Sequence, residues 1–236
     1  DIRALAAIAA AGDWERGVGT VIEADVGGAY VDRLLRDAGP APLRIGWDAG
    51  NGAAGAVIEA LTKRLPGEHH LLFTHIDGNF PNHHPDPTVV ANLADLATLV
   101  VDKKLDFGLA FDGDGDRIGA VDGSGKPLWG DEILAILAGP LLRACPGAAI
   151  VADVKSSQSV FDHIAALGGR PVMWRTGHSQ VKAKMREVGA PLAGEMSGHI
   201  FFAHDYYGFD DALYAAIRLI DAVGQSGRPL AALRDG

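Results

Sequence analysis

Three aspartates at alternate positions, Asp112, Asp114 and Asp116, most constrain what this chain can fold into. Glycines separate them and Arg117 follows directly, a composition that favours a tight loop. Apolar residues precede the loop at 105–111 and follow it at 118–121, and each of these runs is typical of a buried strand. The loop therefore holds three carboxylates between two strands, where their mutual repulsion is costly unless a hard cation is bound.

Three kinds of site could explain this loop. A solvated acidic turn is the usual meaning of one Asp-Gly pair, but it explains three alternating aspartates poorly. A helix–loop–helix calcium site would need Gly where Arg117 stands and Glu where Gly123 stands, so it is excluded. Magnesium takes a few carboxylates and completes its shell with water or phosphate oxygen, and an adjacent arginine suits phosphate. We therefore expect Mg²⁺ at Asp112, Asp114 and Asp116, with the acidic turn as the alternative.

Strand and helix patterns alternate along the chain, which predicts two consecutive α/β domains with mostly parallel mixed sheets. The expected strands lie at 43–47, 70–74, 105–111, 118–121, 149–152, 171–174, 190–193 and 199–203. The expected helices lie at 2–11, 29–37, 89–103, 131–144, 179–187 and 209–223; one more follows the 48–52 stretch and ends at about 64, and another begins at about 157. Asp131 is predicted to cap the helix that it begins. A hairpin turn at 122–126 suggests the domain boundary. The predicted segments are a tail of a preceding domain or linker (1–24), a domain with the Asp loop (25–126) and a second domain (127–236).

Four polar side chains follow the ends of predicted strands: Asp112, Lys155, His178 and Glu195. In open α/β sheets, ligands bind at the carboxyl ends of the strands. We therefore expect these four side chains to line one cleft.

Composition limits the partners of this chain. Thirty acidic residues oppose 21 basic ones, for a net charge of −9, and no basic run occurs, which argues against nucleic acid and anionic membranes. Cys145 is the only cysteine, so no disulfide can form within the chain, and a reducing, cytoplasmic location is expected. A phosphate site would have to use local cationic groups, and the candidates are Arg117, Lys155, Arg175, Lys182 and Lys184.

Five stretches together resemble the α-D-phosphohexomutases: 110–117, 194–199, 176–179, 153–155 and 78–87. Met196 points to the phosphomannomutase/phosphoglucomutase branch. The resemblance implies a reversible 1-to-6 phosphoryl shift on mannose or glucose phosphate, through a phosphoserine and a hexose 1,6-bisphosphate. It also implies Mg²⁺ as the cofactor at the Asp loop.

The resemblance also implies roles for single residues. Arg117 would support the phosphoryl group, although a surface ion pair with a neighbouring Asp is the alternative. Glu195 and Ser197 stand two apart, so in extended chain they point the same way, and the family uses this pair on sugar hydroxyls. His199 is a candidate acid/base, because imidazole titrates near neutrality, or else a structural histidine at a strand start. The family places Lys155 and His178 near the substrate.

Two motifs of that family do not occur here: the Thr-Ala-Ser-His-Asn-like nucleophile motif of the first domain and the phosphate-binding loop of the fourth. We therefore interpret the chain as the two middle domains, with a short tail of the first. It is expected to be inactive alone, because the serine domain is missing.

Two other functions compete. Gly50, Gly52 and Gly55 form a G-x-G-x-x-G pattern after a strand and before a helix, as in NAD(P)-binding oxidoreductases, and Asp77 mimics the ribose-binding acid. That interpretation leaves the Asp loop and the 194–199 stretch unexplained. The third function is a phosphosugar-binding module without catalysis, because an isolated pair of middle domains would lack the nucleophile.

Overall fold

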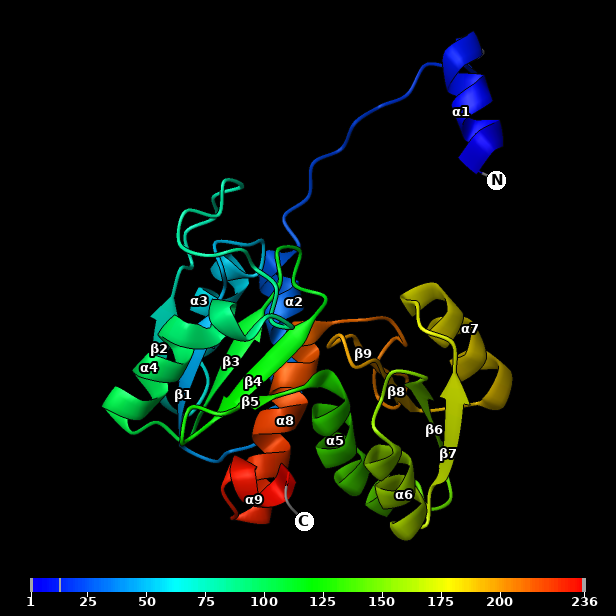
Figure 1. The fold of residues 1–236 in the computed structure, drawn as a ribbon. Helices are drawn as coiled ribbons and strands as arrows, with labels where there is room; N and C mark the ends of the chain where they lie inside the picture. The colour runs from blue at the N-terminus through cyan, green and yellow to red at the C-terminus, as the bar shows by residue number, and fades with distance from the viewer. Residues whose placement is uncertain (1, 13, 235–236) are drawn as a thin grey trace.

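The computed structural model describes residues 2–12 and 14–234, so residues 1, 13, 235 and 236 of the expected segments lie outside it. After α1 (Ile2–Ala11), the chain forms two α/β units that lie side by side (Figure 1). The elements of the first unit are α2 (Gly27–Leu35), β1 (Leu43–Asp48), α3 (Gly55–Thr62), β2 (Gly67–Leu72), the 3₁₀ turn η1 (Val90–Leu93), α4 (Ala94–Lys103), β3 (Phe107–Phe111), β4 (Ile118–Asp122) and β5 (Pro127–Leu128).

The second unit begins with a long helix that follows β5 directly. Its elements are α5 (Gly130–Ala144), β6 (Ala149–Asp153), α6 (Gln158–Ala166), β7 (Arg170–Trp174), α7 (His178–Val188), β8 (Leu192–Gly194), β9 (Ile200–Phe202), α8 (Ala212–Ser226) and α9 (Leu230–Arg234).

Each unit contains one mixed sheet. The first has the order β2-β1-β3-β4-β5, in which β1 is parallel to β2 and β3, and β4 and β5 are antiparallel additions. The second has the order β7-β6-β8-β9, in which β6 is parallel to β7 and β8, and β9 is antiparallel. The predicted fold class is therefore confirmed.

Helices cover both faces of the sheets, as the apolar strands require. In β6, Ala149 and Val151 pack with α7, whereas Ile150 and Ala152 face the opposite side, where the large core lies. A strand whose successive side chains point to opposite faces must be apolar throughout when both faces are covered. The second unit is therefore a three-layer α/β/α arrangement.

One continuous core joins the two units. Trp47 and Phe111 of the first sheet belong to the same buried cluster as Leu134 of α5 and Ile217 of α8. Helices α5 and α8 thus pack against both sheets (Figure 1). A shared apolar core fixes how the units sit relative to each other, because separating them would expose these side chains to water.

The first helix does not join this core. None of the side chains of α1 is buried, and an extended segment separates it from α2 (Figure 1).

Among the described residues, no helix combines the length and the apolar character needed to cross a membrane.

The structure corrects several sequence predictions. Helix α5 begins at Gly130 after Trp129, and the Glu132 carboxylate accepts the Trp129 N–H at 2.8 Å, so the prediction that Asp131 caps this helix was wrong. The Asp131 carboxylate instead accepts the Ser157 N–H at 2.8 Å, just before α6. One short element, β5, was not predicted.

Candidate active site

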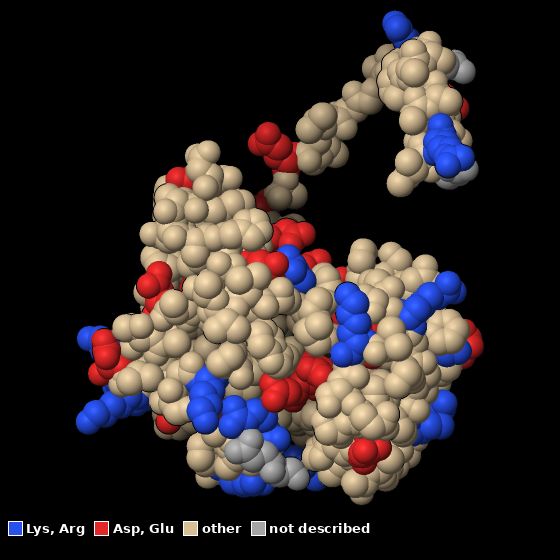
Figure 2. All heavy atoms as spheres, viewed as in Figure 1, with Lys and Arg blue, Asp and Glu red and all other residues tan. Residues whose placement is uncertain are grey.

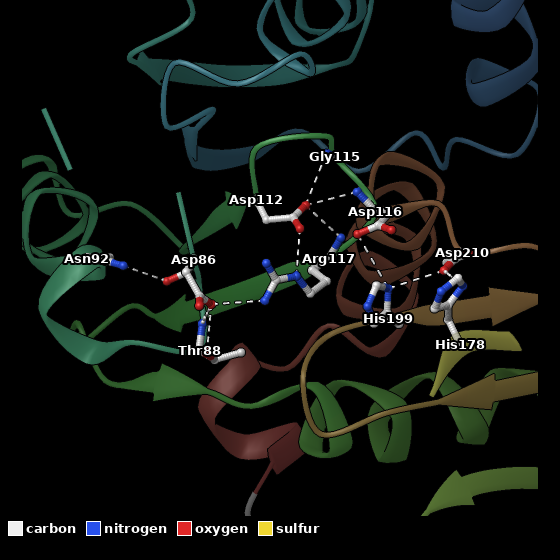
Figure 3. Close-up of polar contacts among 10 residues, drawn as sticks. All are labelled: Asp86, Thr88, Asn92, Asp112, Gly115, Asp116, Arg117, His178, His199 and Asp210. Atoms are coloured by element: carbon white, nitrogen blue, oxygen red, sulfur yellow. Dashed lines mark hydrogen bonds and ion pairs between the residues drawn. The ribbon is translucent and has the colours of Figure 1, made fainter. Parts of the chain in front are cut away.

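The Asp loop lies between β3 and β4 and is closed by its first aspartate. Asp112 is buried, and its Oδ1 accepts the backbone N–H groups of Gly115, Asp116 and Arg117 at 3.1, 3.0 and 3.0 Å (Figure 3). Three N–H donors on one oxygen stabilise its negative charge and fix the loop backbone. Aspartate suits position 112 because its side chain is short and can accept hydrogen bonds from backbone N–H groups a few residues further along the loop.

The three aspartates gather as predicted. Asp112, Asp114 and Asp116 each place a carboxylate oxygen within 4.8 Å of the others. Partial burial, together with the carboxylates of Asp112, Asp114 and Asp210, raises the pKa of Asp116 to about 6, although His199 opposes this shift. An all-oxygen cluster whose members repel one another fits a hard divalent cation such as Mg²⁺.

The side chain of Arg117 points toward carboxylates of the first unit. Its Nε donates to Asp112 Oδ2 at 2.7 Å, and its Nη1 donates to Asp86 Oδ1 at 3.3 Å (Figure 3). Asp86 is in turn held by Thr88, whose hydroxyl donates to Oδ1 at 2.7 Å. The guanidinium is thus oriented beside the carboxylate cluster. It forms ion pairs with neighbouring aspartates, which was the alternative to a role in phosphate binding in the sequence analysis.

The 194–199 stretch forms a tight turn between β8 and β9. Glu195 is buried and its carboxylate accepts the Gly177 N–H, while its backbone N–H donates to the His199 carbonyl at 2.9 Å. Ser197 is half-buried at the tip of the turn.

Asp153, at the end of β6, holds the neighbouring turns together. It is fully buried and accepts the Met196 N–H at 3.1 Å, the Ser156 hydroxyl at 2.9 Å and the Thr176 hydroxyl at 2.7 Å. One carboxylate therefore ties together the turns after β6, β7 and β8. In the sequence analysis, Asp153 was included only as part of the 153–155 stretch. Its position at the end of a predicted strand was the available signal for this structural role.

The Asp loop and the 194–199 turn touch directly. Ile118 N donates to the Gly198 carbonyl at 3.0 Å, and Arg117 forms an antiparallel bridge with His199. Gly198 has φ +100°, and a Cβ there would collide with the Ile118 carbonyl oxygen, so only glycine fits. The two candidate loops of different units therefore form one continuous surface.

His199 lies at this junction. Its Nδ1 lies 3.5 Å from Asp116 Oδ1 and 3.4 Å from Asp210 Oδ2, and its ring stacks on His178 with centroids 5.8 Å apart (Figure 3). Burial lowers the pKa of His199, but the carboxylates of Asp210, Asp116 and Glu195 outweigh it and raise the pKa above its usual value. The imidazole thus lies between a carboxylate of the Asp loop and a carboxylate of the second unit.

The remaining candidates line the edge of the second sheet. Lys155 is exposed in the turn after β6, and no hydrogen bond or ion pair to it was found in the described part of the chain. His178 begins α7 with its side chain 55% exposed. Figure 2 shows the surface hollowed between the two units, with acidic and basic side chains along the hollow. The structure thus brings the Asp loop, Glu195, His178 and His199 close together, whereas Lys155 is exposed in the turn after β6.

Two other predicted phosphate cations form ion pairs with carboxylates of the second unit. Lys182 pairs with Asp210 at 2.7 Å, and Lys184 pairs with Glu187 at 2.6 Å. Arg175 lies 5.6 Å from the centre of the Trp174 ring.

The glycine pattern at 50–55 has a structural explanation. A Cβ on Gly52 would lie 2.7 Å from the Gly113 carbonyl oxygen, and the Ala53 N–H donates to that oxygen at 2.9 Å. A Cβ on Gly55 would collide with Thr74. This turn thus packs directly against the Asp loop, and Gly52 permits that close approach because it has no side chain.

Comparison with known proteins decides the family. Residues 28–125 match the family model described as phosphoglucomutase/phosphomannomutase, alpha/beta/alpha domain II, and residues 129–236 match domain III. The chain belongs to the phosphoglucomutase/phosphomannomutase family. It is 45% identical over 217 residues to a phosphomannomutase/phosphoglucomutase of Pseudomonas aeruginosa, covering 92% of this chain and 47% of that one.

Further relatives agree. A phosphoglucomutase of Neisseria gonorrhoeae is 44% identical over 212 residues, covering 89% of this chain and 46% of that one. A crystal structure of a family protein from Burkholderia thailandensis superposes with a TM-score of 0.94 at 45% identity, covering 99% of this chain and 51% of that one. A phosphomannomutase structure from Thermus thermophilus shares the fold, with a TM-score of 0.83 at 19% identity and coverage of 92% and 51%. The chain thus spans about half the length of these relatives.

Proposed function

We propose that this chain is the middle half of a phosphomannomutase/phosphoglucomutase and carries its metal site and its sugar-binding turn. The reaction is the reversible transfer of a phosphoryl group between positions 1 and 6 of mannose or glucose phosphate, through a phosphoserine and a hexose 1,6-bisphosphate. The names of relatives that are 45% and 44% identical to this chain support this activity. The single observation that carries it is the direct contact between the Asp loop and the 194–199 turn.

The donor set at the Asp loop fits Mg²⁺, and Asp112, Asp114 and Asp116 would hold it. When bound, the ion would polarise the phosphoryl group and offset its charge during transfer. Arg117, oriented by Asp112 and Asp86, supports the phosphoryl oxygens with its remaining N–H donors.

The 194–199 turn recognises the sugar in this proposal. Glu195 accepts hydrogen bonds from ring hydroxyls, and Ser197 donates or accepts beside it. Lys155 and His178 bind the substrate from the same sheet edge. His199 takes the proton of the hydroxyl that attacks the phosphoryl group and gives it to the oxygen that leaves. Its ring lies at the junction of the two loops, where both oxygens would be bound.

The proposed full-length protein contains a first domain with the serine nucleophile and a fourth domain with a phosphate-binding loop. Within this chain, residues 1–24 belong to the first domain or a linker, 25–126 to the second domain and 127–236 to the third. We place the protein in the cytoplasm, where hexose phosphates and a free thiol at Cys145 are compatible.

A mutase assay on the full-length protein and on the 236-residue chain tests this proposal. With Mg²⁺, the full-length protein should interconvert glucose 1- and 6-phosphate and the two mannose phosphates. The isolated chain should not, because the phosphoserine that starts the reaction is proposed to lie outside it. Turnover by the purified chain above contamination controls would contradict the proposed division of labour, and an inactive full-length protein would contradict the function itself.

A non-catalytic phosphosugar-binding module is the second candidate for the isolated chain. It is favoured by the same loop contact, because the metal site and the sugar-binding turn lie in this chain. Binding of hexose phosphate by the purified 236-residue chain without turnover would support it.

A further inference from the structure

One carboxylate that the proposed mechanism does not use contacts three cationic or proton-carrying side chains. Asp210 lies between β9 and α8, and its side chain is only 8% exposed. Its Oδ1 accepts Lys182 Nζ at 2.7 Å, while its Oδ2 lies 3.4 Å from His199 Nδ1 and 3.6 Å from His178 Nδ1 (Figure 3).

We propose that Asp210 is a positioning residue, which holds His199 in the orientation and tautomer that its role as acid/base requires. This inference rests on the proposed function and adds to it a residue that acts through the imidazole. Asp210 is not one of the proposed metal ligands, and the residue of the 194–199 turn that it contacts among the interactions described above is His199 itself.

The geometry at the imidazole supports this role. A carboxylate facing Nδ1 favours the tautomer with a proton on that nitrogen, and leaves Nε2 as the nitrogen that exchanges a proton with a ligand. Asp116 lies 3.5 Å from the same Nδ1, but its carboxylate belongs to the proposed metal site. Asp210 is therefore the carboxylate that can orient the ring while Asp116 binds a cation.

Lys182 makes a buried carboxylate tolerable at this position. Its ammonium offsets the charge of Asp210 without occupying Oδ2, which faces the two histidines. A paired carboxylate costs far less to bury than an isolated one.

The backbone on either side of Asp210 is anchored. Asp210 bridges Phe201 of β9. The next residue, Asp211, caps α8 by accepting the Tyr214 N–H at 2.9 Å, and it also accepts the Tyr30 hydroxyl of α2 at 2.8 Å. Adjacent aspartates thus serve different ends: Asp211 joins the two units, and Asp210 faces the imidazole.

This pair supplies a matched test in the full-length enzyme. Asp210→Asn should lower kcat by about 100-fold, within the range for loss of acid/base function, and leave KM within about threefold. Asp211→Asn should lower the melting temperature and leave kcat within about twofold, since its carboxylate caps α8 and accepts the hydroxyl groups of Tyr30 and Tyr206. Lys182→Met should also keep most of kcat, because it removes the counter-charge and leaves the carboxylate beside His199.

A double-substitution cycle separates positioning from general damage. If Asp210 acts through His199, the double variant of Asp210→Asn and His199→Ala should be no slower than His199→Ala alone. Multiplied losses would show independent effects and overturn the inference. Equal losses of kcat in Lys182→Met and Asp210→Asn would also overturn it, because the carboxylate would then act through the lysine.

The outcomes distinguish this inference from the proposed function. If the unsubstituted enzyme does not interconvert hexose phosphates, the proposed function fails. If the enzyme is active and His199→Ala is inactive, but Asp210→Asn keeps the unsubstituted kcat and a normal melting temperature, only the inference about Asp210 fails.

Discussion

At the scale of single residues, Asp114 is the cleanest probe of the proposed Mg²⁺ site. Its side chain is exposed and takes part in none of the hydrogen bonds described for the Asp loop, whereas Asp112 closes that loop. Asp114→Asn should therefore remove a ligand without disturbing the backbone. We expect Mg²⁺ to bind the 236-residue chain weakly, because the phosphoserine ligand is proposed to lie outside it, and Asp114→Asn to bind about tenfold or more weaker.

Calorimetric titration of Mg²⁺ into both proteins measures this difference. Asp102→Asn is the matched control, because Asp102 is also exposed and lies on α4, outside the cluster. It should bind Mg²⁺ like the unsubstituted chain. Equal affinities for Asp114→Asn and Asp102→Asn would remove Asp114 from the site.

His83 predicts a pH dependence of stability. Its Nε2 lies 3.0 Å from Asp48 Oδ2, and this hydrogen bond raises the pKa of His83 from 6.5 to about 9, although burial opposes the shift. Because the folded pKa exceeds the unfolded one, the stabilisation is fully present below about pH 6.5 and is lost as the pH rises through about 9.

The free energy of unfolding in urea, measured for the unsubstituted chain and for His83→Gln, checks this prediction. The stability difference between them should shrink by roughly 1–3 kcal/mol between about pH 6 and pH 10. A difference that does not change with pH would show that the His83–Asp48 pair contributes no charge-dependent stability.

Sequence identified residues whose chemistry is local and missed those whose partners are distant. The Asp loop could be predicted because its alternation is visible within a few positions. Asp210 could not, since it meets Lys182, His178 and His199 only through the packing of α7 beside β9. Asp153 likewise joins turns that are separated along the chain.

At the scale of elements, Gly198 and Gly139 make opposite predictions for the same substitution. Gly198→Ala should destabilise the chain by roughly 1–3 kcal/mol, because φ is +100° and the new methyl group would collide with Ile118 of β4. Gly139→Ala should stabilise it by about 0.5–1 kcal/mol, because Gly139 lies inside α5 and a Cβ there would make only an ordinary contact with Arg143 Nη1 at 3.8 Å. Denaturant unfolding of both variants decides; a neutral Gly198→Ala would show that the two loops are not tightly joined.

The order of the helices and strands could be predicted because their apolar patterns are long. Errors concentrate where the pattern is short or where a distant contact decides. Strand β2 was expected at 70–74 but runs from Gly67 to Leu72, in register with β1, and the chain turns at Phe73 with φ +53°. Strand β5 has only two residues, too few for any periodicity.

At the scale of the whole molecule, the shared core determines how the two loops meet. Helices α5 and α8 pack against both sheets, so the Asp loop and the 194–199 turn are held together by the fold and not only by their own hydrogen bonds. Sequence could place each loop at a strand end but could not orient one unit against the other. That orientation depends on packing between segments far apart in the chain.

The most direct test of the account separates the two loops in the full-length enzyme. Two quantities are measured for each variant: sugar phosphate affinity by calorimetry, and the rate at which phosphorylated enzyme loses its phosphoryl group to the sugar. Glu195→Ala should weaken sugar binding about ten- to a hundredfold and leave Mg²⁺ affinity unchanged, since a hydroxyl that loses its acceptor costs roughly 1–3 kcal/mol. Asp114→Asn should keep sugar affinity nearly intact while phosphoryl transfer fails.

Glu195→Gln is the control, because it keeps an oxygen for the Gly177 N–H and so preserves the start of α7. If it keeps the melting temperature of the unsubstituted enzyme and still binds the sugar more weakly, the loss is one of recognition and not of the contact with Gly177. We expect opposite losses in Glu195→Ala and Asp114→Asn. If Glu195→Ala binds mannose and glucose 1-phosphate as tightly as the unsubstituted enzyme, the 194–199 turn does not recognise the sugar, and the proposed division between metal site and sugar site is contradicted.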